Sequence, residues 1–279
     1  MNHKICVVTG ATSGVGLAAA MLLAAKGAQL VLIGRDEERG QAAVAKVNAC
    51  AKDATAQFYR ADLSRFAEVK RVAAELRTSW PKIDVLINNA GAIYSRREVT
   101  ADGLERTFAL NHLAYFSLTH LLHDLLVASP QARVINVASE AHRGAELDFD
   151  DLQSSLSYSA RKAYGRSKLC NILYTRELAR RLEGTSITAN YLHPGFVASR
   201  FGDNNNDLFG YALSAAKHLV GIPPKQGAAT IVYLASAPEV RDQSGLYFIN
   251  CSPRNPSQRA QDQSTARRLW DESCRLIGI

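Results

Sequence analysis

The stretch TGATSGVG, residues 9–16, follows the apolar run ICVV and leads into the segment LAAAMLLAA. Its glycines have the spacing G-x-x-x-G-x-G, which differs from a P-loop because no Gly-Lys-Ser/Thr follows. Glycine permits a tight turn and close approach of the backbone, and the N-terminus of a helix attracts a pyrophosphate. We therefore expect a strand, a turn and a helix that hold a dinucleotide, although such a turn can also serve packing alone. The contacts expected here are Gly10, Thr12, Ser13, Gly14, Val15 and Gly16.

Apolar runs alternate with amphipathic stretches along the whole chain. The expected strands are 5–10, 29–34, 83–91, 132–139, 187–195 and 245–250, with a weaker one at 55–62. The expected helices include 36–50, 64–79, 103–128 and 160–183. Nearly continuous apolar strands that alternate with helices indicate a parallel sheet covered on both faces. We predict one α/β domain over residues 1–279, a doubly wound parallel sheet of about seven strands. Residues 1–130 would form the dinucleotide-binding half, and residues 131–279 the catalytic and substrate half.

Composition excludes several classes of function. The formal charge is +7, but Lys and Arg are spread over the chain, which disfavours a nucleic-acid site and suits an anionic ligand. Five cysteines without a C-x-x-C pattern indicate reduced thiols in a cytoplasmic protein. No apolar stretch reaches the roughly 18 residues that span a bilayer, so we expect a soluble protein. His120 and His123 lack a third ligand, so no metal is expected.

The end of the second strand bears on the choice of dinucleotide. NAD sites place an acidic residue there, about 20 residues after the glycines, to bind the ribose 2′-hydroxyl. Here Gly34 occupies that position and Arg35 follows, whose guanidinium suits a 2′-phosphate. NADP(H) is therefore the expected cofactor. Asp36 could argue for NAD if it turned inward, but it could also cap the helix that starts at Glu37.

Two further strand ends carry candidate cofactor contacts. Asp62 and Leu63 could bind the adenine amine, although Asp62 could equally be a helix N-cap. Asn88 precedes Asn89, Ala90 and Gly91, a group that could line the adenine ribose and brace the central strand.

Two Tyr-x-x-x-Lys pairs occur in the chain, Tyr158 with Lys162 and Tyr164 with Lys168. Four residues are about one helical turn, so each pair could share a helix face, but the spacing alone is weak evidence. Together with their neighbours, however, six motifs in order resemble the short-chain dehydrogenase/reductase family over essentially the whole chain. They are TGATSGVG, NNAG, Asn111, Ser139, YGRSK and HPG.

The similarity is closest to the retinol-dehydrogenase-like branch of that family. INVASEAHR at 135–143, AYGRSKLCNILYTRELARRL at 163–182 and the tail ARRLWDESCRLIGI resemble it, as does the long interval between Ser139 and Tyr164. This resemblance favours Tyr164 and Lys168 over the upstream pair. The membrane-bound members carry an N-terminal hydrophobic anchor, whereas this chain begins almost at its first strand. We therefore expect a soluble carbonyl reductase of Rossmann fold.

The resemblance implies a catalytic tetrad of Asn111, Ser139, Tyr164 and Lys168. Tyr164 would be the acid in reduction and the base in oxidation. Lys168 would hold the nicotinamide ribose and, together with the oxidised nicotinamide, lower the pKa of that phenol. Ser139 would orient the substrate oxygen, and Asn111 would hold a water that links Lys168 to solvent.

Three further segments are candidates for contacts with the nicotinamide, the substrate and a second copy of the chain. In HPGFV, Pro194 and Gly195 would turn the chain toward the cofactor, and a backbone N–H near Val197 could bind the carboxamide. Residues 198–224 are the expected lid over an apolar substrate. The leucine-rich stretch 113–127 could form a homodimer or homotetramer contact, or simply core packing.

These observations predict an NADP(H)-dependent oxidoreductase that acts on a small carbonyl or alcohol substrate, a hydrophobic ketone or aldehyde. A redox-sensing regulator without catalysis would be expected to lack the Tyr or the Lys. A nucleotide-sugar epimerase or dehydratase would be expected to carry a larger C-terminal domain and no NNAG.

Overall fold

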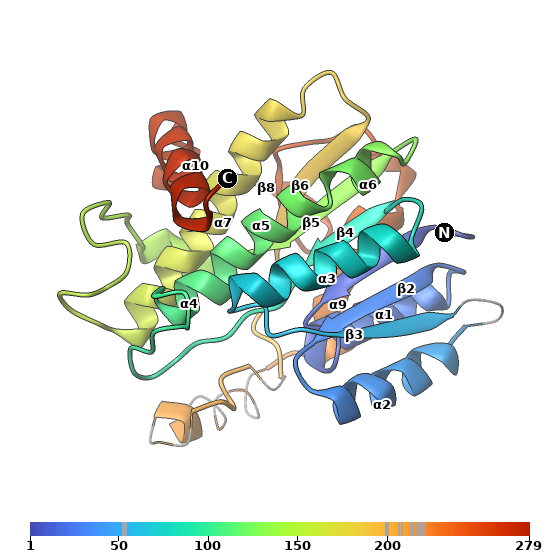
Figure 1. Cartoon of the computed structure of the whole chain (residues 1–279), viewed down its shortest axis with the longest axis horizontal. Helices are drawn as coiled ribbons and strands as arrows, with labels where there is room; N and C mark the ends of the chain where they lie inside the picture. Colours follow the sequence, from blue (N-terminus) through green and yellow to red (C-terminus); the bar gives the residue numbers. More distant parts are fainter. Residues whose placement is uncertain are drawn as a thin grey trace.

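The computed structural model describes residues 1–51, 55–198, 201–205, 207, 209–212, 215, 217 and 221–279. These residues form one eight-stranded sheet of order β3-β2-β1-β4-β5-β6-β7-β8 (Figure 1). Its strands are β1 (Ile5–Thr9), β2 (Gln29–Gly34), β3 (Ala56–Arg60), β4 (Val85–Asn88), β5 (Ala132–Val137), β6 (Ile187–His193), β7 (Tyr247–Ile249) and β8 (Ser252–Arg254). Among these strands β8 alone is antiparallel to its neighbour. The prediction of one doubly wound α/β domain is confirmed.

Helices cover both faces of the sheet, which is why every residue of β1 and β4 is buried. On one face lie α1 (Gly14–Ala24), α2 (Glu37–Asn48) and α9 (Pro224–Ser236), whose apolar side chains share a core with β1 and β2. On the other lie α3 (Phe66–Ser79), α5 (Ala114–Leu121) and α7 (Ala160–Arg181). The order of the strands reverses between β1 and β4, so the carboxyl ends of these strands border the crevice where such folds bind ligands.

The helix predicted over residues 103–128 is divided into shorter pieces. They are α4 (Arg106–Phe108), a π-helical turn η1 (Ala109–Leu113), α5 and α6 (His123–Val127). Glu105 begins the first piece, because its carboxylate accepts hydrogen bonds from the N–H groups of Thr107 and Phe108, both at 2.7 Å. A π turn inserts one residue into a helix and is often found at functional sites. Here it contains Asn111.

One strand was not predicted from the sequence. Residues 252–254, Ser-Pro-Arg, are exposed, and they join the sheet through a tight turn at Asn250 and Cys251. Both turn residues have positive φ, 51° and 59°, which matches the twist of a two-residue hairpin. Because all three residues of β8 are exposed and only Pro253 is apolar, hydrophobic patterning could not reveal this strand.

The C-terminal helix α10 (Gln263–Ile277) packs along α7, as Figure 1 shows. Trp270 of α10 lies between aromatic rings of two other helices, 4.9 Å from Phe116 and 5.9 Å from Tyr174 between centroids. For the leucine-rich stretch 113–127 the sequence left two alternatives open, an oligomer contact or core packing. Most of its side chains are buried within this chain, so core packing explains its leucines.

Two findings concern membranes and metals. Of the helices that the structure describes, none combines the length and apolar character needed to cross a bilayer. Nor do three His, Cys, Asp or Glu side chains come together as a possible metal site within the described part of the chain.

Candidate active site

The glycine turn forms a cradle at the carboxyl end of β1. Gly10 and Gly14 have positive φ, 65° and 56°, a conformation that other residues rarely adopt. A Cβ on Gly16 would lie 2.5 Å from both the Asn89 amide nitrogen and the Gly10 carbonyl oxygen. At the start of α1 the Ser13 side chain makes no capping hydrogen bond, and the first turn has no acidic residue. The N–H groups of that turn are therefore available to an anion.

At the end of β2 the backbone leaves little room for an acidic side chain. A Cβ on Gly34 would lie 2.7 Å from Cγ2 of Thr12, on the glycine turn. The Asp36 carboxylate accepts hydrogen bonds from Arg39 N–H at 3.0 Å and Arg39 Nε at 2.9 Å, so Asp36 caps α2. Arg35 is exposed and makes no hydrogen bond or ion pair with any described residue.

The end of β4 is held against the glycine turn. Thr9 Oγ1 accepts hydrogen bonds from the N–H groups of Asn89 and Ala90, at 2.8 and 3.0 Å. The Asn89 amide donates in return to the Thr9 carbonyl oxygen at 2.9 Å. Asn88 points into the sheet interior, where its amide donates to Asn136 at 2.8 Å. The expected bracing of the central strand is therefore observed.

Asp62 lies beyond β3 and does not cap α3, whose N-cap is Arg65. Its carboxylate instead accepts hydrogen bonds from the Ser64 N–H at 3.0 Å and the Ser64 hydroxyl at 2.7 Å. The interpretation of Asp62 as a helix cap is thus wrong. Leu63 is buried beside it.

Asn111 is fully buried in the π turn and holds the segment that follows NNAG. Its Oδ1 accepts a hydrogen bond from Ala92 N–H, and its Nδ2 donates to the Ala92 carbonyl oxygen, both at 2.9 Å. Nδ2 also donates to the Ser167 hydroxyl at 3.0 Å. Both polar atoms of the side chain therefore bond to protein groups, and the expected water relay stays a prediction.

Lys168, Tyr164 and Ser139 meet where α7 passes the end of β5. Lys168 Nζ donates to the Val137 carbonyl oxygen at 2.9 Å and lies 5.7 Å from the centre of the Tyr164 ring. The Ser139 hydroxyl lies near enough to the Tyr164 phenol to lower the pKa of that phenol. A Cβ on Gly91 would lie 3.2 Å from Asn111 Oδ1 and 3.5 Å from Lys168 Nζ, so all four predicted catalytic residues border one region.

Burial dominates the electrostatics of this cluster. It raises the pKa of Tyr164 to about 12, which the Ser139 hydroxyl opposes only in part. Burial also lowers the pKa of Lys168 to about 7. The expected lowering of the phenol pKa by Lys168 is therefore not seen in the protein alone, because desolvation disfavours both charged forms. In this state Tyr164 carries its proton.

The upstream Tyr158–Lys162 pair lies elsewhere. Tyr158 precedes α7, which begins at Ala160, and its hydroxyl donates to the Tyr94 carbonyl oxygen at 2.7 Å. This hydroxyl also lies 3.3 Å from Thr107 Oγ1, so its contacts are with the segments around Tyr94 and Thr107.

Residues after β6 border the same region. Gly195 has a positive φ of 91°, and no described residue accepts a hydrogen bond from Val197 N–H. Of the expected lid, residues 199–200, 206, 208, 213–214, 216 and 218–220 lie outside the described residues. The Phe201 ring packs 5.0 Å from that of Tyr164. Asn205, within the expected lid, is held by hydrogen bonds: its side-chain amide accepts from Ser95 N–H at 2.7 Å and donates to the Ile93 carbonyl oxygen at 2.8 Å.

Comparisons with known proteins bear on the family of this chain. The family model of the short chain dehydrogenase matches residues 4–208. The chain belongs to the short-chain dehydrogenase/reductase family. Within this family it falls in the retinol-dehydrogenase-like branch, and it is an oxidoreductase. It is 38% identical to mouse retinol dehydrogenase 14, over 100% of this chain and 87% of that protein. It is 37% identical to human retinol dehydrogenase 13, over 99% of this chain and 85% of that protein.

Solved structures place this short-chain dehydrogenase in the same fold. A crystal structure of a protein from Mycobacterium paratuberculosis superposes with a TM-score of 0.79 at 31% identity, covering 99% of this chain and 94% of that one. An NADP active-site complex of RhlG from Pseudomonas aeruginosa gives a TM-score of 0.70 at 29% identity, covering 89% and 94%.

Several residues at the site were not singled out from the sequence. Thr9 joins two strand ends, Ser167 supports Asn111, and Phe201 covers Tyr164. Thr9 stands within the glycine motif itself, so its position was a usable signal. The other two depend on contacts between distant segments, which no local pattern records.

Proposed function

We propose that this short-chain dehydrogenase transfers hydride between NADP(H) and a carbonyl/alcohol pair, with hydrophobic ketones or aldehydes as substrates. The observation that carries the proposal is the meeting of Ser139, Tyr164 and Lys168 beside the glycine cradle. A protonated phenol next to a hydroxyl is suited to receive and protonate one substrate oxygen.

The residues present fit a bound dinucleotide phosphate. The uncapped first turn of α1 would hold its pyrophosphate, and Gly16 lets the turn pack tightly, because a Cβ there would overlap the Gly10 carbonyl oxygen and the Asn89 side chain. Arg35 would bind the 2′-phosphate, since Asp36 is engaged by Arg39 and position 34 has no carboxylate. Asp62 with Leu63, and Asn89 with Ala90 and Gly91, would border the adenosine. Pro194, Gly195 and Val197 would approach the nicotinamide end.

In the reductive direction, bound NADPH would supply the hydride to the carbonyl carbon. Ser139 would donate a hydrogen bond to the carbonyl oxygen and orient it. Tyr164 would then give its phenolic proton to that oxygen, which completes the alcohol. Lys168, held by the Val137 carbonyl oxygen, would stabilise the phenolate left behind.

Support for an apolar substrate comes from Phe201, whose ring packs on Tyr164 where substrate would enter. The relatives named retinol dehydrogenases point the same way, because retinol is a hydrophobic alcohol. The engaged loop residue Tyr158 supplies a matched control for the catalytic tyrosine.

The test is turnover of a panel of ketones and aldehydes, followed by NADPH absorbance, in wild type, Tyr164→Phe and Tyr158→Phe. We expect Tyr164→Phe to lower kcat by at least about 100-fold, the usual contribution of a positioned acid, and Tyr158→Phe to keep most of it. Loss of turnover in Tyr158→Phe with retention in Tyr164→Phe would overturn the assignment.

A further inference from the structure

His142 is a fully buried histidine that lies three residues after Ser139, in the short helical turn η2 (Glu140–Gly144). Its Nδ1 lies 2.7 Å from the Ser139 carbonyl oxygen, and its Nε2 lies 3.1 Å from the backbone nitrogen of Ser257. A backbone N–H can only donate, so Nε2 is the acceptor. The proton must then be on Nδ1, which donates to Ser139.

This imidazole fixes Ser139 together with the rest of the turn. The Ser139 carbonyl oxygen also accepts a hydrogen bond from the His142 backbone N–H at 3.1 Å. On the other side the Ser139 hydroxyl oxygen accepts from Ala141 N–H at 3.2 Å. The hydroxyl proton of Ser139 is therefore left to point toward Tyr164 and a substrate oxygen.

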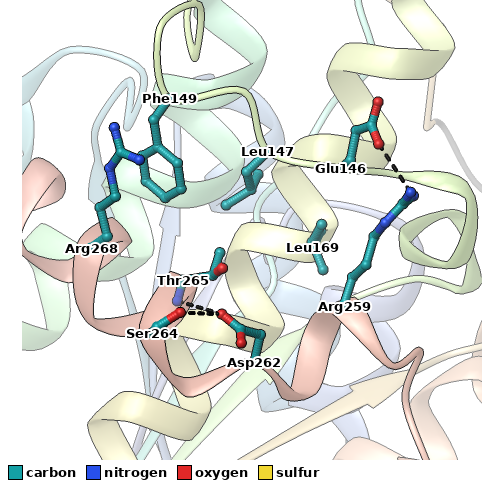
Figure 2. A pocket seen from close by; sticks show the side chains of 9 residues that line it. All are labelled: Glu146, Leu147, Phe149, Leu169, Arg259, Asp262, Ser264, Thr265 and Arg268. Atoms are coloured by element: carbon teal, nitrogen blue, oxygen red, sulfur yellow. Dashed lines mark hydrogen bonds and ion pairs between the residues drawn. The ribbon is translucent and has the colours of Figure 1, made fainter.

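Ser257 belongs to a C-terminal segment that contacts the loop after η2 through Arg259 and Arg268. Figure 2 shows Arg259 paired with Glu146, and Arg268 over the ring of Phe149. The Arg259–Glu146 ion pair measures 3.0 Å, and the pocket that these side chains line has a volume of about 550 Å³. The Arg259 and Glu146 side chains are 60% and 72% exposed, so their pairing contributes little. The buried His142 imidazole, in contrast, reaches Ser139 itself.

We propose that His142 is a positioning residue for the reaction. Its imidazole, held in the Nδ1–H form by the Ser257 backbone, keeps the Ser139 hydroxyl aimed at the substrate oxygen. The C-terminal segment thus takes part in catalysis through one buried ring. This inference rests on the proposed function, because it assumes that Ser139 binds the reacting oxygen.

Two substitutions separate the two ends of the imidazole. His142→Asn places an amide near Nδ1 and keeps a donor for the Ser139 carbonyl oxygen. His142→Gln places its amide near Nε2 and keeps an acceptor for Ser257 N–H while losing the donor to Ser139. We expect kcat to fall on the order of tenfold to a hundredfold in the Gln variant, because small misplacements at a reacting centre have effects of this size. The Asn variant should stay within about threefold of wild type, with KM for NADPH unchanged in both.

Arg259→Ala is the matched control. It removes the exposed ion pair with Glu146 from the same C-terminal segment and should leave kcat unchanged. If the Gln variant fails to fold, His142→Ala replaces it in the comparison with Asn. Equal kcat in the Asn and Gln (or Ala) variants would overturn the positioning role. Wild-type protein that does not reduce any carbonyl of the panel would instead contradict the proposed function, so the two failures are distinguishable.

Discussion

The site places a phenol and an ammonium in one buried region, where both charged forms are disfavoured. For Lys168 this has a measurable effect on stability, because its pKa is lowered from 10.5 to about 7 by burial. Between these values the unfolded chain binds one proton more than the folded protein, so the free energy of unfolding rises with pH. The rise should approach about 1.4 kcal/mol for each pH unit. The raised pKa of Tyr164 affects stability only above its unfolded value of 10.0, so below that pH the effect of Lys168 stands alone.

Urea unfolding of wild type and Lys168→Met, at about pH 7.5 and about pH 9.5, tests this expectation. Lys168→Met also loses the hydrogen bond to the Val137 carbonyl oxygen, and this loss lowers the free energy of unfolding of the variant by the same amount at both pH values. The wild type should therefore gain stability relative to the variant as the pH rises. A constant difference between the two proteins would show that Lys168 keeps its proton in the folded state.

For individual residues, the sequence predicted which side chains border the site but not which hydrogen bonds position them. Gly10, Gly14 and Gly16 predict the turn, because few other residues fit the backbone there. Asp36 could be anticipated as a cap from its place before a helix. The partners of Asn111 could not, since Ala92 is 19 residues away and Ser167 is 56.

Among the elements, α10 supplies a part of the core that an isolated Rossmann sheet would leave open. Trp270 packs against Phe116 and Tyr174, and the guanidinium of Arg181 lies 4.3 Å from its ring centre. Trp270 is only partly buried, so its removal takes away these ring contacts without emptying an enclosed core site. We expect Trp270→Ala to lower the free energy of unfolding by about 2 kcal/mol, less than the loss for a fully buried aromatic ring.

Chemical denaturation measures this loss, with Arg267→Ala as the control because Arg267 is exposed on the same helix. The control should change stability by less than about 0.5 kcal/mol. Similar losses in both variants would mean that α10 as a whole, rather than the aromatic contact, determines stability.

Elements were predictable where they carry an apolar face. Strands β1, β2, β4, β5, β6 and β7 follow clear apolar runs, since helices cover them on both sides. The edge strand β3 gave only a weak signal, because two of its five residues are exposed. The exposed β8 has no such run. The π turn at Ala109–Leu113 was also missed, because one inserted residue hardly changes an apolar periodicity that continues on both sides of it.

At the scale of the whole molecule, the proposed cofactor would contact strand ends of both halves of the sheet. A ligand that binds only the folded state stabilises all of it by mass action, by about 2.7 kcal/mol at a hundred times its Kd. For a domain of this size that corresponds to a rise in Tm of roughly 5–10 °C. If Arg35 binds the 2′-phosphate, NADPH should raise Tm more than NADH at equal concentration.

Replacing Arg35 tests this at the same scale. A charge-assisted hydrogen bond contributes about 1.5–3 kcal/mol, so Arg35→Ala should weaken NADPH binding roughly 10- to 100-fold. In thermal unfolding of this variant, NADPH should then raise Tm no more than NADH does. The rise in Tm caused by NADH itself should be the same as in wild type. Arg267→Ala removes the same charge from the distant α10 and should keep the excess. An Arg35→Ala protein that still prefers NADPH would place the 2′-phosphate contact on another residue.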